Sequence, residues 1–133
     1  MRFKRITIIR TRKPSEGDLN EKLQWFGGTL GLFGSRDKDK SCFRIFIVLL
    51  RNMKDEGAIS SDDIADRTGL SRGTVVHHLN KLMKSGIVTS EKSGYQVKVD
   101  RLEELVDVLK SEVERSFKNL KDVAEELDNN LGL

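Results

Sequence analysis

The stretch TGLSRGTVVHHLNKLMKSGIV, residues 68–88, decides which fold we expect for this chain. Its apolar residues Val75, Leu79 and Leu82 are spaced four and three positions apart, which predicts a helix with one buried stripe. Ser71 stands before the stripe as an N-cap, and a glycine followed by two β-branched residues ends it.

The opposite face of this helix, residues 71–85, is polar or small and carries no acidic side chain. The major groove of DNA, roughly 12 Å wide, admits one helix whose N-terminal end carries small or hydrogen-bond-donating side chains. Free N–H groups and the helix dipole also favour a phosphate at that end. We expect DNA contacts from Ser71, Arg72, Gly73, Thr74, Val76, His77, Asn80 and Lys81.

Four residues of this helix have competing explanations. Arg72 is the best candidate for a bidentate contact with guanine, because a cation is otherwise unfavourable near a helix N-terminus. Gly73 is a poor helix former. Its presence is explained either by close approach to DNA or to a neighbouring chain, or by neutral drift. His77 is either a groove contact or an ordinary surface residue, and His78, beside the buried stripe, is expected to pack.

A helix over residues 37–56 is predicted upstream, closed by Gly57 as a left-handed C-cap. It is apolar nearly all round, so a second element or another subunit must cover the face that the core leaves. A short strand over 58–60 leads to Ser60, which forms a capping box with Asp63 at the start of the next helix.

Two strands, 87–90 and 95–99, follow the central helix and are joined by a loop that contains Ser93 and Gly94. Lysines flank this loop, and a thin tip allows it to approach the DNA backbone. Lys92 and Lys98 are the expected phosphate contacts, and Ser93 and Gly94, which are expected to keep the tip thin, are included with Lys92 among the DNA-binding residues.

Helix, short strand, helix, glycine turn, helix and hairpin is the element order of the winged helix-turn-helix. Residues 41–99 resemble the ArsR-like branch of bacterial and archaeal regulators, in which Leu-Ser-x-x-Thr-Val-x-x-His-Leu-x-x-Leu-x-x-x-Gly-Leu/Ile-Val recurs; here it reads LSRGTVVHHLNKLMKSGIV over 70–88. The resemblance implies a mainly α protein with a small β component that regulates transcription as a dimer on double-stranded DNA. Two recognition helices would then lie about 34 Å apart on a pseudo-palindrome.

Residues 1–36 are expected to form an N-terminal extension, ahead of a winged helix domain over 37–100. A strand over 2–12, a proline turn, a short helix over 18–26 and a packed glycine-rich loop over 27–34 are predicted within it. Residues 1–40 hold 10 Lys/Arg against 5 Asp/Glu, a net charge of +5. This basic segment either contacts the DNA backbone or is a solvated edge.

The last segment, 101–133, is predicted to be a long helix capped by Asp100 and Glu103. With 5 Lys/Arg against 9 Asp/Glu its net charge is −4, so DNA would repel it. Its apolar stripe pairs with a second copy over 101–127, folds back over helix 37–56, or does both. The N-terminal extension is a further candidate for the contact with the second copy. The stripe comprises Leu102, Val106, Leu109, Val113, Phe117, Leu120, Val123 and Leu127.

Other functional classes have little support in the sequence. The single cysteine, Cys42, excludes an intrachain disulfide and fits a reducing compartment; it is either a thiol with a lowered pKa or a small buried residue. The longest apolar run, 45–50, is too short to span a membrane, and no secretory signal is present, so a cytoplasmic location is expected.

No catalytic, cofactor or metal site is expected. The chain has no Gly-x-Ser-x-Gly, Walker, dinucleotide-binding or His-Glu-x-x-His motif, and GGTLGLFG lacks the Lys-Ser/Thr of a phosphate loop. Adjacent helical histidines diverge by about 100°, so His77 and His78 do not share an ion easily. The alternative function is a winged helix module that contacts protein or RNA without reading bases.

Overall fold

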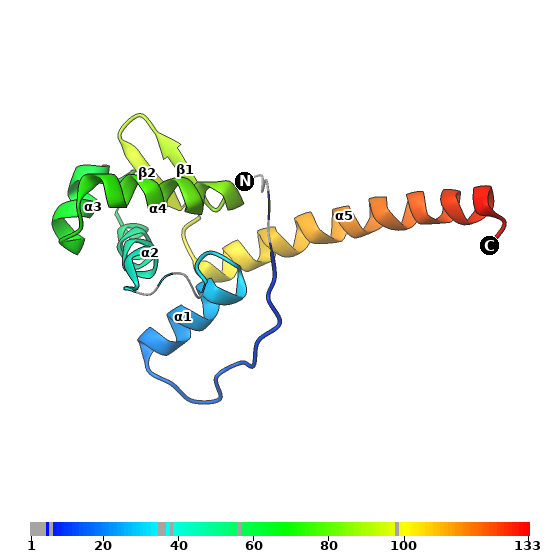
Figure 1. Ribbon diagram of the computed structural model, residues 1–133, viewed down its shortest axis with the longest axis horizontal. Coiled ribbons are helices and arrows are strands. Elements are labelled where there is room, and N and C mark those ends of the chain that lie inside the picture. Colours follow the sequence, from blue (N-terminus) through cyan, green and yellow to red (C-terminus); the bar gives the residue numbers. More distant parts are fainter. Residues whose placement is uncertain (1–4, 6, 35–36, 38, 56, 98) are drawn as a thin grey trace.

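The computed structural model describes residues 5, 7–34, 37, 39–55, 57–97 and 99–133. It is mainly helical with one two-stranded antiparallel sheet, which confirms the expected fold class. The elements in chain order are α1 Leu19–Thr29, α2 Ser41–Asn52, α3 Ser61–Thr68, α4 Arg72–Ser85, β1 Val88–Glu91, β2 Gly94–Val97 and α5 Leu102–Leu131. Figure 1 shows α2, α3, α4 and the hairpin gathered at one end and α5 extending away from them.

One hydrophobic core holds the three central helices, the hairpin and the start of α5 together. Phe46 of α2, Ile64 of α3 and Leu79 of α4 are fully buried in it. The hairpin closes one side through Val88 and Val97, which face each other across the two strands. From α5 only the first turns take part, so the rest of that helix has no share in the core.

Helix α1 runs farther than expected, through two glycines to Thr29. Gly27 is buried there, and a Cβ atom at this position would lie 2.2 Å from Cζ of Phe33. The Phe33 ring packs in turn against Phe43 of α2, with 5.5 Å between ring centroids. The predicted loop over 27–34 is therefore wrong for its first three residues, because close packing of Phe33 outweighs the low helix propensity of glycine.

The predicted strand over 2–12 is not observed where it can be judged. Residues 2–4 and 6 lie outside the described residues, and residues 5 and 7–12 form no strand. The backbone N–H of Ile9 donates to the carbonyl of Thr29 at 2.8 Å, so the segment attaches to the end of α1. No described strand lies beside it to complete a ladder, and β-branched composition alone does not make a sheet.

Helix α2 is shorter than the predicted 37–56, because hydrogen bonds end it inside the predicted range on both sides. The Asp37 carboxylate accepts hydrogen bonds from the backbone N–H groups of Cys42 at 2.9 Å and Phe43 at 3.1 Å. At the other end, the N–H of Met53 closes a tighter turn onto Leu50. Gly57 has a left-handed φ of 101° but lies beyond this end, so its predicted role as C-cap is wrong.

The hairpin turn contains Lys92 and Ser93, whereas Gly94 is the first residue of β2 and pairs with Glu91. A Cβ atom at Gly94 would lie 2.1 Å from the carbonyl oxygen of Ile59. Ile59 bridges Tyr95 through two backbone hydrogen bonds, so the predicted short strand over 58–60 appears as a single bridge. Gly94 is thus required by close approach of two backbones and does not keep the tip thin.

The long C-terminal helix is confirmed over 30 residues, but its predicted cap is not. Arg101 is the N-cap residue and makes no side-chain capping bond. Asp100 instead donates its backbone N–H to the carboxylate of Glu104 at 3.3 Å. None of the helices in the described part of the chain is both long and apolar enough to cross a membrane.

Candidate nucleic-acid interface

The turn between α3 and α4 fixes the angle at which α4 is presented. Ser60 caps α3 by accepting from the N–H of Asp63 at 3.1 Å, which confirms the predicted contact. Thr68, buried at the end of α3, donates its hydroxyl to the carbonyl of Ile64 at 2.8 Å and accepts from the N–H of Leu70 at 3.3 Å. The guanidinium of Arg44 on α2 donates to the Thr68 carbonyl, so side chains from two helices hold this turn.

Helix α4 begins and ends as predicted. The Ser71 hydroxyl accepts from the N–H of Thr74 at 3.2 Å and donates to the Thr74 hydroxyl at 2.8 Å. Gly86 ends the helix with a left-handed φ of 87°. The stripe of Val75, Leu79 and Leu82 is fully buried, as its spacing predicted.

The outward face of α4 lies opposite that stripe and is open. Gly73, His77, Asn80 and Lys84 are exposed along its centre, at successive helical turns. Val76 is half-buried, to one side of that centre. Lys84 was not among the predicted contacts, although its spacing of four from Asn80 and seven from His77 places it on the same face.

Arg72 projects from the N-terminal end of α4, with 72% of its side chain exposed. Its Nε atom lies 3.5 Å from Oδ1 of Asp62 on α3, whose side chain is 70% exposed. Exposed ion pairs of this kind contribute only about 0–1 kcal/mol, so a phosphate or a guanine can displace Asp62. Arg72 is therefore available to a ligand that approaches along α4.

The hairpin projects beside α4 (Figure 1). Lys92 and Ser93 are exposed at its turn, and Gln96 donates to the Glu91 carboxylate at 3.2 Å across the strands. Lys98, also a predicted phosphate contact, lies outside the described residues. A helix-turn-helix with an open, acid-free face and an exposed lysine at an adjacent hairpin is the arrangement that major-groove binding requires.

Residues 47–89 match a family model described as winged helix-turn-helix DNA-binding. The match runs from the middle of α2 through α3 and α4 into β1, so it contains the outward face of α4 and ends before the hairpin turn. The chain thus carries a DNA-binding winged helix domain, which points to a non-enzymatic regulator with DNA as its partner. Neither the curated proteins nor the solved structures contain a match to this chain.

One flank of α4 in the winged helix domain faces the glycine-rich turn. His78 and Lys81 line a cavity of about 400 Å³ together with the segment 31–34, Asp37 and Cys42. Lys81 also lines a second cavity, of about 230 Å³, on the other side of Gly31. Lys81 is exposed but lies to the side of the outward face, between α4 and the N-terminal extension.

One basic side chain of the extension, Arg5, lies at the same flank. Arg5 lines the smaller cavity with Lys81 and Lys84, and Thr7 and Ser85 supply hydroxyl groups there. Other basic residues of the described extension, Arg10, Arg12 and Lys13, are exposed. A phosphate beside the C-terminal half of α4 would meet several cations at once.

Burial is the main cause of the shifted pKa values of Cys42 and His78, which both line the cavity of about 400 Å³. Burial raises the pKa of the Cys42 thiol to about 12, and the nearby Asp37 carboxylate adds to the rise. Sγ of Cys42 donates to the carbonyl of Leu32 at 3.7 Å. The hypothesis of a lowered thiol pKa is wrong, because desolvation raises the pKa by more than the nearby helix N-terminus can lower it.

His78 has the packed position that was expected of it. Burial lowers its pKa below the ordinary 6.5, and the charge of Lys81 lowers it further. Its Nδ1 atom is buried and has no hydrogen-bond partner among the described residues. The described residues hold no group of three or more His, Cys, Asp or Glu side chains that could bind a metal ion.

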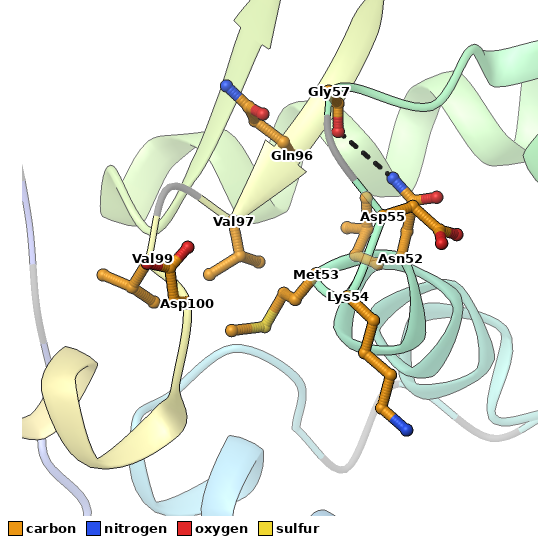
Figure 2. Close-up of a pocket in the computed structure, with 10 residues that line it drawn as sticks. Asn52, Met53, Lys54, Asp55, Gly57, Gln96, Val97, Val99 and Asp100 are labelled. Atoms are coloured by element: carbon orange, nitrogen blue, oxygen red, sulfur yellow. Dashed lines mark hydrogen bonds between the residues drawn. The ribbon is translucent and has the colours of Figure 1, made fainter.

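A further cavity, of about 600 Å³, has no lining residue from α4. Figure 2 shows it between the end of α2, strand β2 and the connection to α5. Met53 and the side chains of Val97 and Val99 supply apolar surface, whereas Lys54 and Asp100 are charged. Its volume is within the range of small-molecule sites, but its lining is more polar than is usual for them.

Proposed function

We propose that the chain is a sequence-specific transcription regulator of the ArsR-like kind found in bacteria and archaea. It acts in the cytoplasm as a dimer on double-stranded DNA. The observation that carries the proposal is the outward face of α4, where Gly73, His77 and Asn80 are exposed, no acidic residue occurs, and Arg72 projects from the N-terminal end. A helix buried on one stripe and free on the other is suited to enter the major groove.

In this proposal α4 reads bases near its N-terminus, and the hairpin contacts the backbone. Arg72 makes the bidentate contact with guanine, releasing Asp62, while Gly73 lets the helix approach the base edges. Lys92 and Ser93 meet phosphates beside the groove, and Lys84 joins them from α4. The remaining assigned contacts are Ser71, Thr74, Val76, His77, Asn80, Lys81 and Gly94, the last through its backbone only.

Helix α5 provides the dimer contact. Phe117, Leu120, Val123 and Leu127 are each more than half exposed, on a helix that leaves the core after Leu109. An apolar stripe of this length in water favours pairing with a second copy. The first part of the stripe packs on the core of its own chain through Leu102 and Leu109, whereas these four residues lie beyond the core and are left for the second copy.

The test begins with the recognition sequence, obtained by selecting duplexes from a random pool with the full chain. We expect Arg72→Ala to weaken binding to the selected duplex far more than binding to random duplex, a loss of discrimination of roughly 1–3 kcal/mol. Arg115→Ala, which removes an exposed arginine of α5, is the matched control and should change neither. Fluorescence anisotropy at two salt concentrations measures both affinities.

Two results would favour other functions. An equal loss on both duplexes would make Arg72 a phosphate contact without a reading role. Selection that yields no preferred duplex, while structured RNA or a protein partner binds in the same buffer, would favour the alternative winged helix module without base readout.

A further inference from the structure

The exposed stripe of α5 has the spacing of a coiled coil. From Val113 onward, apolar residues follow one another at intervals of four, three, four, three and four. Such a repeat places all of them on one seam that faces a partner helix. The seam residues are Val113, Phe117, Leu120, Ala124, Leu127 and Leu131.

The seam continues toward the core and ends in an apolar groove. Val106 is 44% exposed, and Leu102, one turn earlier, lines a groove of about 300 Å³ between α1, α2 and the start of α5. Leu19, which is 69% exposed, and Leu50 also line it. Leu131 and Leu133 at the far end of the chain are 69% and 87% exposed, so groove and helix end each lack a cover among the described residues.

We propose that this groove holds the C-terminal end of α5 from a second copy, in an antiparallel pair; the inference rests on the dimer of the proposed function. In this pair Phe117 lies opposite Leu120 of the second copy, and Val113 lies opposite Ala124. Val106 then lies opposite Leu131 of the second copy. The last turn of each helix thereby reaches Leu102 and the groove of the other.

Charges on one flank of the seam balance in this register. It sets Glu114 beside Lys121 of the second copy and Asp107 beside Asp128, each twice by symmetry, because all four residues flank the seam on the same side. A register in which the two helices overlap by one heptad less sets Glu114 beside Asp128 of the second copy. It also sets Lys121 beside Lys121 of the second copy. Like charges in such positions are destabilising.

Side-chain volume favours the antiparallel direction. A parallel pair in register would place Phe117 against Phe117, which gives a crowded layer. It would place Ala124 against Ala124, which leaves a cavity. The antiparallel register combines a large with a medium side chain and a small with a medium one, which fills the layers evenly. A parallel pair would also set Lys110 against Lys110 at a seam position.

The register also fixes how far apart the two DNA-binding domains join the pair. Each domain joins α5 near Leu105, and the pair is centred between residues 118 and 119. At 1.5 Å per residue the two attachment points lie ~40 Å apart along the helices.

The test is disulfide crosslinking of the full chain. Val113→Cys and Ala124→Cys variants, one carrying a tag that changes its mass, are mixed, equilibrated and oxidised. We expect the mixed Val113→Cys/Ala124→Cys product and no product between identical variants, since only unlike positions face each other. The unsubstituted chain, whose Cys42 is buried, is the control and should give no crosslink.

Each of the other crosslinking results would contradict a specific part of the proposed pair. Crosslinking between two Ala124→Cys chains would show a parallel pair, and crosslinking of Val113→Cys with a Leu131→Cys variant would show the register slid by one heptad. Sedimentation distinguishes the two levels of inference: a monomeric full chain refutes the proposed dimer, whereas a dimer with the wrong crosslinks refutes only this arrangement.

A second variant tests the groove. Leu19→Glu adds a charge to an exposed groove residue without touching the core, and should raise the dissociation constant of the dimer about tenfold or more. Ile8→Glu alters another exposed apolar residue, outside the groove, and should leave it unchanged. An unchanged dissociation constant for Leu19→Glu would exclude the groove from the interface.

Discussion

Two glycines of the winged helix domain differ in what a side chain would meet. A Cβ atom at Gly94 would lie 2.1 Å from the Ile59 carbonyl oxygen, and its φ of 143° is strained for any other residue. A Cβ atom at Gly73 would meet no atom within 4 Å. Gly94 is therefore explained by the fold, whereas the fold gives no reason for a glycine at position 73 on the open face of α4.

Substitution with alanine should separate these two roles. We expect Gly94→Ala to lower the free energy of unfolding by about 2 kcal/mol or more, because the bridge to Ile59 must open. Gly73→Ala should raise it by about 0.5–1 kcal/mol, since alanine favours helix, and yet weaken binding to the selected duplex. Urea unfolding and anisotropy titrations measure the two quantities; undiminished DNA affinity of Gly73→Ala would mean that close approach is not needed at this position.

At the scale of elements, the flank of α4 depends on the glycine-rich turn. His78 and Lys81 face the segment 31–34, and Asp37 both borders this cavity and caps α2. The N-terminal extension thus connects the start of α2 to the recognition helix. A change in the packing of this turn would be transmitted to α4 through the flank of the helix that carries His78 and Lys81.

The buried position of His78 has a pH-dependent consequence. Because burial and Lys81 hold its pKa below 6.5 in the folded chain, the unfolded chain binds more protons as the pH falls below that value. Stability should therefore fall from pH 7.5 toward pH 5, and His78→Gln should lose less than the wild type over this range. Urea unfolding at both pH values measures the difference.

His77→Gln is the matched control, because it removes the exposed neighbouring imidazole of the same helix. If both variants changed the pH dependence equally, burial of His78 would not be its cause.

At the scale of the whole molecule, the proposed dimer contact and the proposed DNA contact lie on different parts of the chain. The core ends at Leu109, and the acidic part of α5 beyond it extends away from the α4 face (Figure 1). Deleting all of 101–133 would also remove Leu105 and Leu109 from the core, so substitutions on the exposed stripe are a cleaner test. They leave the buried part of the helix unchanged.

The double variant Phe117→Glu/Leu120→Glu should be a folded monomer. Both side chains are more than 60% exposed, so their replacement should not lower the stability of the isolated chain. Affinity for a two-half-site duplex should fall by roughly 100-fold or more, because the second half-site loses its linked partner. Sedimentation and anisotropy measure the two effects.

Arg115→Glu/Lys118→Glu adds the same two glutamates at exposed polar positions of α5 and should remain dimeric. If the control also dissociated, added negative charge rather than loss of the apolar stripe would explain the result.

Local patterns predicted the elements that periodicity and capping residues define. The stripe of α4, its Ser71 cap, its glycine end and the length of α5 followed from spacing alone. The predictions failed where distant residues supply the partner: the strand over 2–12 has no described ladder to join, and α1 continues through Gly27 because Phe33 packs on it. The candidate DNA contacts stay predictions; most of them are exposed, whereas Thr74, Val76 and Gly94 are half-buried.

The sequence by itself determined the helix-turn-helix, because periodicity, capping and turn residues act within a few positions of each other. Only the tertiary structure decided that Lys81 lies beside the N-terminal extension, why Gly94 is a glycine, and that Cys42 is desolvated. It also showed that the stripe of α5 continues into a groove formed by α1 and α2. These properties depend on which atoms from distant positions come into contact, and spacing along one helix does not specify that.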